Sequence, residues 1–374
     1  MLEVGVSENL RQAIRAAVAT DQTELTALRE NVAVLRNNIK RIKPRRGTAI
    51  SLVGTDGGNN RVAFDPFAVD LIRVVDSNDK QYCLEALTPN VTVEQLDARH
   101  FDDDGNPYTS LGRMLEALGC TSISGISSII ATKPELRSSI WAQIYRELIE
   151  WAVLFELVNQ GPLHSDTVIL FDGLLRSKKF DHGLFGDLHK LIDAAITKHY
   201  VDHRRRVFVV GIAKRNKFLL KYRLAMALEG VMRNTYASYV TVDDNLQLTA
   251  YKWDEIVTGG GEGESFSAGQ MFLVKFGSHS HDPIWAIEIL KSQVTHASTV
   301  MGYLLADAQE GFPVPLYPMC LQRAHEKAAL VGLDQDILQD EIVGVIRESL
   351  DSNERWLLDE LSLQPSDLSS ARYQ

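Results

Sequence analysis

The chain has 374 residues, of which 45% are hydrophobic and 24% are charged, and its formal net charge is −10. These fractions are ordinary for a globular protein and exclude collagen-like, disulfide-scaffold and wholly disordered chains. No apolar run approaches the roughly 18 residues of a membrane span, and the N-terminus lacks the layout of a signal peptide. The three cysteines are widely spaced and predict neither disulfides nor a zinc site. We therefore expect a cytoplasmic protein that binds no membrane.

The negative charge is concentrated near the C-terminus, where ten acids and three bases from residue 331 onward account for −7 of the −10. The rest of the chain contains three basic clusters without acids. Their members are Arg36, Lys40, Arg41, Lys43, Arg45 and Arg46; Arg204, Arg205 and Arg206; and Lys214, Arg215, Lys217, Lys221 and Arg223. Such clusters are either solvated helix faces or phosphate-binding surfaces, so the overall acidity does not exclude nucleic acid as a partner.

The predicted elements mix helices with strands along the whole chain. A helix over residues 8–43 is ended by Pro44, and a buried strand over 49–54 leads into a turn at 55–58. The other expected strands cover 61–76, 81–87, 167–171, 206–213, 246–252, 271–276 and 284–290, and the other expected helices cover 134–158, 183–200, 294–307 and 321–329. Strands joined by crossover helices predict an α/β fold with a mixed sheet.

Two aspartates occupy the same position relative to short apolar strands. Asp56 follows the strand over 49–54, Asp172 follows the strand over 167–171, and each precedes a glycine. Open α/β sheets bind ligands at the carboxyl ends of their strands, and two carboxylates that lie close together are stabilised by a divalent cation. The pattern predicts a metal site; the alternative is that each Asp-Gly pair is a simple turn.

The helix over residues 134–158 offers candidates for a further ligand. Glu147 and Glu150 are one helical turn apart and line one face, and the following loop returns the chain to the strand that ends at Asp172. A glutamate facing the end of the sheet completes a metal site. The alternative is a solvated glutamate or one that is paired with Arg146.

Four blocks of the sequence together resemble the NurA family of DNA-end-processing nucleases. The blocks are residues 52–58, the helix with Glu150 that leads to 170–174, residues 210–214, and residues 317–325. Their order and rough spacing are those of the family. The resemblance implies an RNase H-like mixed sheet flanked by helices. We expect a nuclease domain over 47–334, between an N-terminal helical arm (1–46) and an acidic helical tail (335–374).

The resemblance also implies roles for individual residues. The implied metal ligands are Asp56, Glu150, Asp172 and His325, with Glu147 as the alternative to Glu150; Lys214 and Tyr317 complete the implied catalytic set. In this scheme Asp56 bridges two ions, Lys214 faces the scissile phosphate, and Tyr317 contacts a phosphate or water. The implied DNA-binding residues are Lys40, Arg41, Lys43, Arg45, Arg46, Arg215 and Lys217.

The activity that the resemblance implies is a Mn²⁺-dependent deoxyribonuclease with a two-metal site, for which Mg²⁺ is the alternative ion. It is expected to act as a 5′-3′ exonuclease and single-strand endonuclease in DNA end resection, repair or phage defence. The implied partners are DNA, a second copy of the chain in a homodimer, and a HerA-like hexameric ATPase. Because DNA would repel the acidic tail, we expect the tail to point away from DNA, toward the ATPase or a second subunit. The alternatives are another RNase H-like nuclease and a catalytically inactive DNA-binding adaptor that regulates the ATPase.

Overall fold

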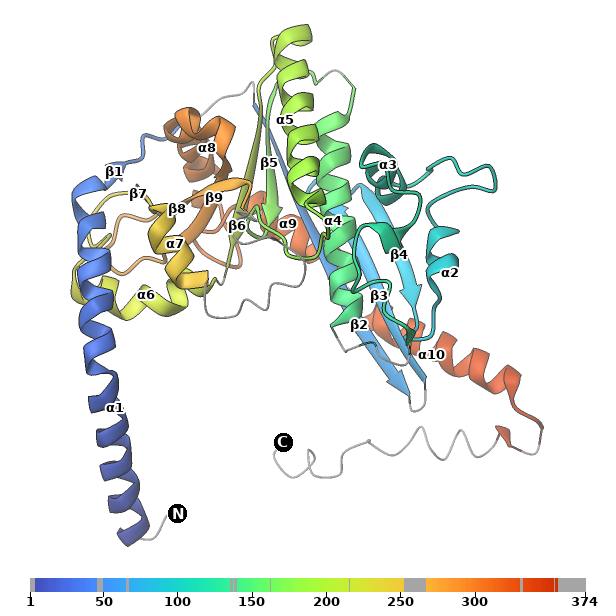
Figure 1. The fold of residues 1–374 in the computed structure, drawn as a ribbon, viewed down its shortest axis with the longest axis horizontal. Coiled ribbons are helices and arrows are strands. Elements are labelled where there is room, and N and C mark those ends of the chain that lie inside the picture. The colour runs from blue at the N-terminus through green and yellow to red at the C-terminus, as the bar shows by residue number, and fades with distance from the viewer. Residues whose placement is uncertain are drawn as a thin grey trace.

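The computed structural model describes residues 4–45, 50–64, 67–134, 137, 140–161, 163–214, 216–251, 267–329, 332–352 and 354–355. Within them, nine strands form one mixed sheet in the order β1-β7-β8-β9-β6-β5-β2-β3-β4 (Figure 1). The strands are β1 (Lys40–Arg41), β2 (Ile50–Phe64), β3 (Phe67–Asp76), β4 (Gln81–Leu87), β5 (Asp166–Asp172), β6 (Val207–Ala213), β7 (Ser238–Thr241), β8 (Gly269–Lys275) and β9 (Trp285–Leu290). The predicted mixed α/β fold is confirmed.

The half of the sheet that ends at β4 is an antiparallel meander followed by two parallel strands. Strand β3 pairs antiparallel with β2 and with β4, whereas β5 runs parallel to β2 and β6 runs parallel to β5. This order and these directions are those of the RNase H-like core that the resemblance implies. Strands β9, β8, β7 and β1 extend the sheet beyond β6 with antiparallel pairing. Strands β5 and β6 are buried nearly throughout, as expected of apolar runs covered on both faces.

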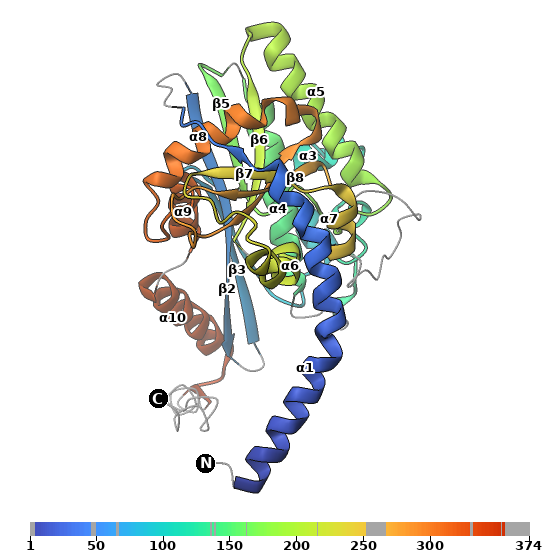
Figure 2. The same cartoon turned by 90° about the vertical axis from the view of Figure 1, so that its left-hand side faces the viewer.

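Helices cover both faces of the central strands. Figures 1 and 2 show α4 (Trp141–Asn159) and α5 (Leu184–His203) on one face and α8 (Ala297–Gln309) and α9 (Met319–Ala328) on the other. Each face has its own apolar core, one containing Trp151 and Phe171 and the other containing Leu170 and Leu321. The carboxyl end of β5 is therefore enclosed between α4 and α9.

The N-terminal helix α1 (Val4–Ala33) extends away from the body of the molecule (Figure 1). Its C-terminal part packs on α6 (Lys217–Leu228), where Val32 is buried together with Phe218 and Tyr222. The remaining helices are α2 (Val93–Asp97), α3 (Ser110–Ala117), α7 (Asp244–Tyr251) and α10 (Gly332–Ser349), with 3-10 turns at Val34–Asn38, Ile123–Gly125 and Lys291–His296. Among the described residues, no helix has the length and hydropathy that crossing a membrane requires.

Four predicted elements differ from the structure. The first helix ends at Ala33, and Lys40–Arg41 instead pairs with β7. Residues 55–58 form no turn, because β2 continues to Phe64 and pairs with β3 from Thr55 onward. The predicted strand over 61–76 is therefore split between the end of β2 and β3. The predicted strand over 246–252 is helix α7 over its described residues; Leu246 and Ala250, four apart, are buried on the same helix face. The three-part division of the chain stays a prediction.

Candidate metal centre

Asp56 and Asp172 lie on neighbouring strands at the point where β5 ends. The last pair of residues between β2 and β5 is Thr55 with Phe171, so the next residues of the two strands are Asp56 and Asp172. Side chains alternate between the faces of a sheet. Leu170 packs in the core on the α8 and α9 face, so Asp172, two residues later, points to that face as well. The two carboxylates thus meet where β2 continues beyond the end of β5.

Helix α9 brings His325 to the same point. Its backbone lies directly on β2 on both sides of Asp56: a Cβ atom at Gly54 would be 2.7 Å from the carbonyl oxygen of Cys320, and one at Gly58 would be 2.1 Å from that of Ala328. His325 Nδ1 consequently lies 2.5 Å from Asp56 Oδ2. The two glycines are therefore required by the close approach of the helix rather than by a turn.

Asp56, Asp172 and His325 form a potential ligand group. Each offers one atom, and these atoms all lie within 4.8 Å of one another. The side chains of Asp56 and Asp172 are 10% and 13% exposed, whereas that of His325 is 62% exposed. Two carboxylates and an imidazole suit Mn²⁺, whereas a purely oxygen donor set favours Mg²⁺ or Ca²⁺. The donors fit a divalent cation that enters from the solvent side of His325.

Two further predicted catalytic residues hold Asp172. The ammonium of Lys214, at the end of β6, lies 2.9 Å from Asp172 Oδ2, and the hydroxyl of Tyr317 donates to Asp172 Oδ1 at 3.0 Å. Tyr317 is fully buried and packs edge-on against Trp285, whose indole N–H donates to the carbonyl of Leu316. Asp172 is thus fixed in position before any ion binds.

The charges at the centre shift the pKa values of its groups. Burial and then the nearby Asp56 carboxylate raise the pKa of Asp172, and Lys214 and Tyr317 only partly oppose them. The contact with Asp56 raises the pKa of His325, against the opposing effects of burial and of Lys214. Burial is the main cause of the first shift, and the negative charge of Asp56 contributes to both. A divalent cation would offset that charge, and this agrees with the donor set.

Glu150 approaches β2 from the opposite face. A Cβ atom at Gly57 would be 2.1 Å from Glu150 Oε1, so this glycine leaves room for the carboxylate. Glu150 Oε1 lies 3.1 Å from Arg146 Nε, and the Glu150 side chain is 11% exposed. Burial raises the pKa of Glu150 to about 8; Arg146 lowers it, and the charges of Asp56, Glu147 and Asp172 raise it. The close group of three ligands does not include Glu150.

Glu147 points to a different partner. Its Oε1 atom accepts a hydrogen bond from the hydroxyl of Ser177 at 2.7 Å, and burial raises its pKa. Of the two glutamates, Glu150 is the one that lies against β2, at Gly57, beside Asp56. It is therefore the glutamate nearer to the three potential ligands. The pairing with Arg146 that the sequence left open is also present.

The predicted DNA-binding residues lie on different elements of the structure. Lys40 and Arg41 lie on β1, an edge strand that five other strands separate from β2. The guanidinium of Arg41 lies over the ring of Tyr236 at 5.4 Å, and the backbone of Arg45 donates to Gly302. Lys43, Arg45 and the adjacent Lys40 and Arg41 are exposed. Lys217 begins α6, shortly after Lys214. Arg46 and Arg215 lie outside the described residues.

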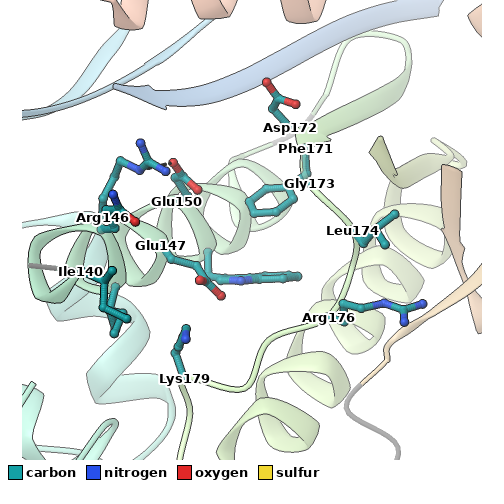
Figure 3. A pocket seen from close by; sticks show the side chains of 13 residues that line it. Ile140, Arg146, Glu147, Glu150, Phe171, Asp172, Gly173, Leu174, Arg176 and Lys179 are labelled. Carbon is teal, nitrogen blue, oxygen red and sulfur yellow. Dashed lines mark ion pairs between the residues drawn. The ribbon is translucent and has the colours of Figure 1, made fainter. Parts of the chain in front are cut away.

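A cavity of about 410 Å³ opens beside the carboxylates on the α4 side (Figure 3). Its polar lining comes from α4 and from the loop after β5, and includes Arg146, Glu147, Glu150, Asp172, Arg176 and Lys179. Sequence reasoning missed Arg176, Ser177 and Lys179. No motif surrounds these residues, and their position depends on the path of a loop.

No family model and no curated protein sequence matches this chain. Solved structures that are similar to it include the NurA nuclease from Sulfolobus solfataricus, with 10% identity, a TM-score of 0.43, and coverage of 94% of this chain and 99% of that one. A NurA structure with manganese has 12% identity and a TM-score of 0.41, covering 91% and 99%. A NurA structure bound to dAMP and manganese has 11% identity and a TM-score of 0.39, covering 93% and 99%. The resemblance to NurA nucleases is confirmed as a likeness along nearly the whole chain.

Proposed function

We propose that the chain is a metal-dependent nuclease that hydrolyses phosphodiester bonds in DNA. The observation that carries the proposal is the convergence of Asp56, Asp172 and His325, with ligand atoms within 4.8 Å of one another at the end of the sheet. Lys214 and Tyr317 hold Asp172 in place. Hard-cation ligands beside a lysine are the groups that phosphodiester hydrolysis needs.

In this proposal Asp56 and Asp172 bind Mn²⁺, with Mg²⁺ as the alternative, and His325 supplies a nitrogen ligand. These residues would hold the ions, whose chemistry would be to activate the attacking water and to stabilise the departing oxygen. Lys214 contacts a non-bridging oxygen of the scissile phosphate and stabilises its developing charge. Tyr317 keeps the Asp172 carboxylate aimed at the site. Glu150, whose carboxylate is paired with Arg146, would be a further ligand only if it exchanged that guanidinium for the ion.

The finer parts of the proposal concern the mode of cleavage and the partners. We propose 5′-3′ exonuclease and single-strand endonuclease activity, a homodimer, and a HerA-like hexameric ATPase as the partner. The projecting part of α1 supports an additional protein contact. Leu10, Ile14 and Val18 are spaced four residues apart and are 47%, 53% and 63% exposed, forming an apolar stripe.

A cleavage assay on single-stranded DNA with Mn²⁺ tests the proposal. The wild-type protein should cut, whereas Asp56→Asn and Asp172→Asn should cut on the order of 10³-fold more slowly but should still bind the strand. Asp187→Asn is the matched control, because Asp187 is an exposed carboxylate on α5 that pairs with Lys190. A wild-type protein that binds DNA and never cuts it, with or without the ATPase, would instead be the adaptor.

A further inference from the structure

The cavity beside the metal centre has a charged end that the proposed chemistry does not use. Figure 3 shows Asp172 near one end and Lys179 toward the other, with the Lys179 side chain pointing toward Glu147. Ile140 and Phe171 add apolar surface to the lining. An aromatic and aliphatic wall together with a few polar groups is typical of a small-molecule pocket.

The basic side chains that line the cavity differ in whether they already pair with a carboxylate. Arg146 pairs with Glu150 at 3.1 Å. Arg176 pairs with the fully buried Glu288 and also donates to Gln247. Within the described part of the chain, no carboxylate lies within 4.0 Å of the Lys179 ammonium, although Lys179 is close enough to Glu147 to lower its pKa. Lys179 is therefore the lining cation best placed to accept an anion.

We infer that this cavity takes the terminal nucleotide of an unpaired DNA strand and that Lys179 binds the phosphomonoester at the strand end. The inference rests on the proposed nuclease function and names the part of the substrate that lies beyond the scissile phosphate. With the scissile phosphate at Asp172, the next nucleotide enters the cavity and directs its terminal phosphate toward Lys179. Lys179 is thus a specificity-determining residue for strand ends.

The size of the cavity suits a single nucleotide. Small-molecule pockets span about 300–1,000 Å³, and the cavity of about 410 Å³ lies within this range.

The carboxylate of Glu147 lies where the terminal phosphate would bind, so binding of that phosphate would require the positive charge of Lys179. This carboxylate is held by the Ser177 hydroxyl and faces the same space. A phosphate close to Glu147 is repelled unless Lys179 compensates the charge. Removing the ammonium should therefore abolish the preference for a phosphorylated end and favour a hydroxyl end.

Binding of short single-stranded DNA to the full chain in EDTA, followed by fluorescence anisotropy, tests the inference without cleavage. Three oligonucleotides of one sequence carry a 5′-phosphate, a 3′-phosphate or hydroxyls at both ends. The wild-type protein should bind one phosphorylated form about tenfold more tightly than the hydroxyl form, as expected for one charge-assisted hydrogen bond. The form that is preferred identifies which end enters the cavity.

Variants separate Lys179 from general attraction to DNA. Lys179→Ala should lose the preference and Lys179→Arg should keep it. Lys178→Ala, which removes the same charge from an exposed neighbour outside the lining, should also keep it. Equal affinity of the wild type for all three forms, or equal effects of Lys178→Ala and Lys179→Ala, would overturn the inference. If the protein discriminates between strand ends but cuts no DNA in Mn²⁺, the proposed nuclease function is contradicted and the end-binding cavity is not. If the protein cuts DNA without discriminating between ends, the end-binding cavity is contradicted and the nuclease function is not.

Discussion

Strand β2 carries two different polar sites on its two faces, one residue apart. On the α9 face, Asp56 meets His325, whose side chain is 62% exposed. On the α4 face, Gly57 makes room for Glu150, whose side chain is 11% exposed and is paired with Arg146. The first site is open to ions from solvent, whereas the second holds a buried carboxylate with a partner of its own. Under the proposed function the ion would bind on the α9 face, and Glu150 would have to leave Arg146 before it could join the site.

The largest expected effect is on cleavage. Asp56→Asn should lower the rate of DNA cleavage in Mn²⁺ on the order of 10³-fold, because it removes a charged ligand at the reacting centre. Glu150→Gln should lower the rate by a smaller factor, since Arg146 already occupies that carboxylate. The rates come from single-turnover assays at saturating Mn²⁺. Equal losses in the two variants would show that both faces contribute equally.

Affinity for the ion should depend on His325. His325→Ala should weaken Mn²⁺ binding by about 10–100-fold in isothermal titration calorimetry, by analogy with the loss of groups that support metal ligands. His296→Ala is a suitable control, because His296 packs against Phe208 instead. If His325→Ala binds Mn²⁺ as tightly as the wild type, helix α9 contributes no ligand to the metal site.

His325 also predicts opposite pH dependences for stability and metal binding. Its pKa is raised above 6.5, mainly by the contact with Asp56. The stability that this contact adds to the metal-free protein is therefore complete below pH 6.5 and is lost as the pH rises through the raised pKa. Mn²⁺ needs the neutral imidazole, so its affinity should rise over the same interval. Thermal melting in EDTA and calorimetry with Mn²⁺ between pH 5.5 and 8.5 measure the two trends, which His325→Gln should lack.

Alanine at the two glycines tests each face separately. Gly58→Ala places a methyl group against the backbone of α9, and Gly57→Ala places one against the end of the flexible Glu150 side chain. Both should lower the free energy of unfolding, by about 1–3 kcal/mol, and Gly58→Ala by more, because a backbone yields less easily. Gly344→Ala, at a position with open space, is the control. Urea denaturation gives the values; a larger loss for Gly57→Ala would contradict the description of the two faces.

The smallest expected effect concerns Glu150 in the metal-free protein. Its pKa is about 8 when folded and ordinarily 4.5. Between these pH values the folded protein keeps a proton that the unfolded chain releases, so the free energy of unfolding falls as the pH rises. Glu150→Gln should remove this fall, so the free energy of unfolding of the variant in EDTA should change less between pH 5 and pH 8.5 than that of the wild type. If Mn²⁺ stabilises the wild-type protein and the Glu150→Gln variant to the same extent at pH 8.5, Glu150 is not a ligand.

Local patterns predicted the buried parts of the sheet. The apolar runs that became β5 and β6 were predictable, because strands covered on both faces carry few polar positions. The strand over Gln81–Leu87 is an edge strand that is buried at only two of its seven residues, and it followed from its β-forming residues instead. The proximity of Asp56 and Asp172 followed from parallel strands that end together. These features depend only on residues that are neighbours in sequence and on a general rule of sheet geometry.

The remaining features depend on contacts between distant segments. The glycines at 57 and 58 predict a turn by local rules, yet they serve the approach of Glu150 and Ala328 from two helices. No local signal indicates that Lys40–Arg41 leaves the helix to pair with β7. The sequence likewise gave no sign of the cavity beside Asp172, because its lining depends on how the loop after β5 passes below α4.

The central claim is that one divalent ion site is shared by Asp56, Asp172 and His325. A crystal of the protein soaked in Mn²⁺, measured at a wavelength where manganese scatters anomalously, tests it most directly. We expect an anomalous peak in contact with both aspartates and with the imidazole, and with Glu150 turned away from Arg146 if it is recruited. A peak elsewhere, or Asp172 still paired with Lys214 and no ion between the two carboxylates, would contradict the account.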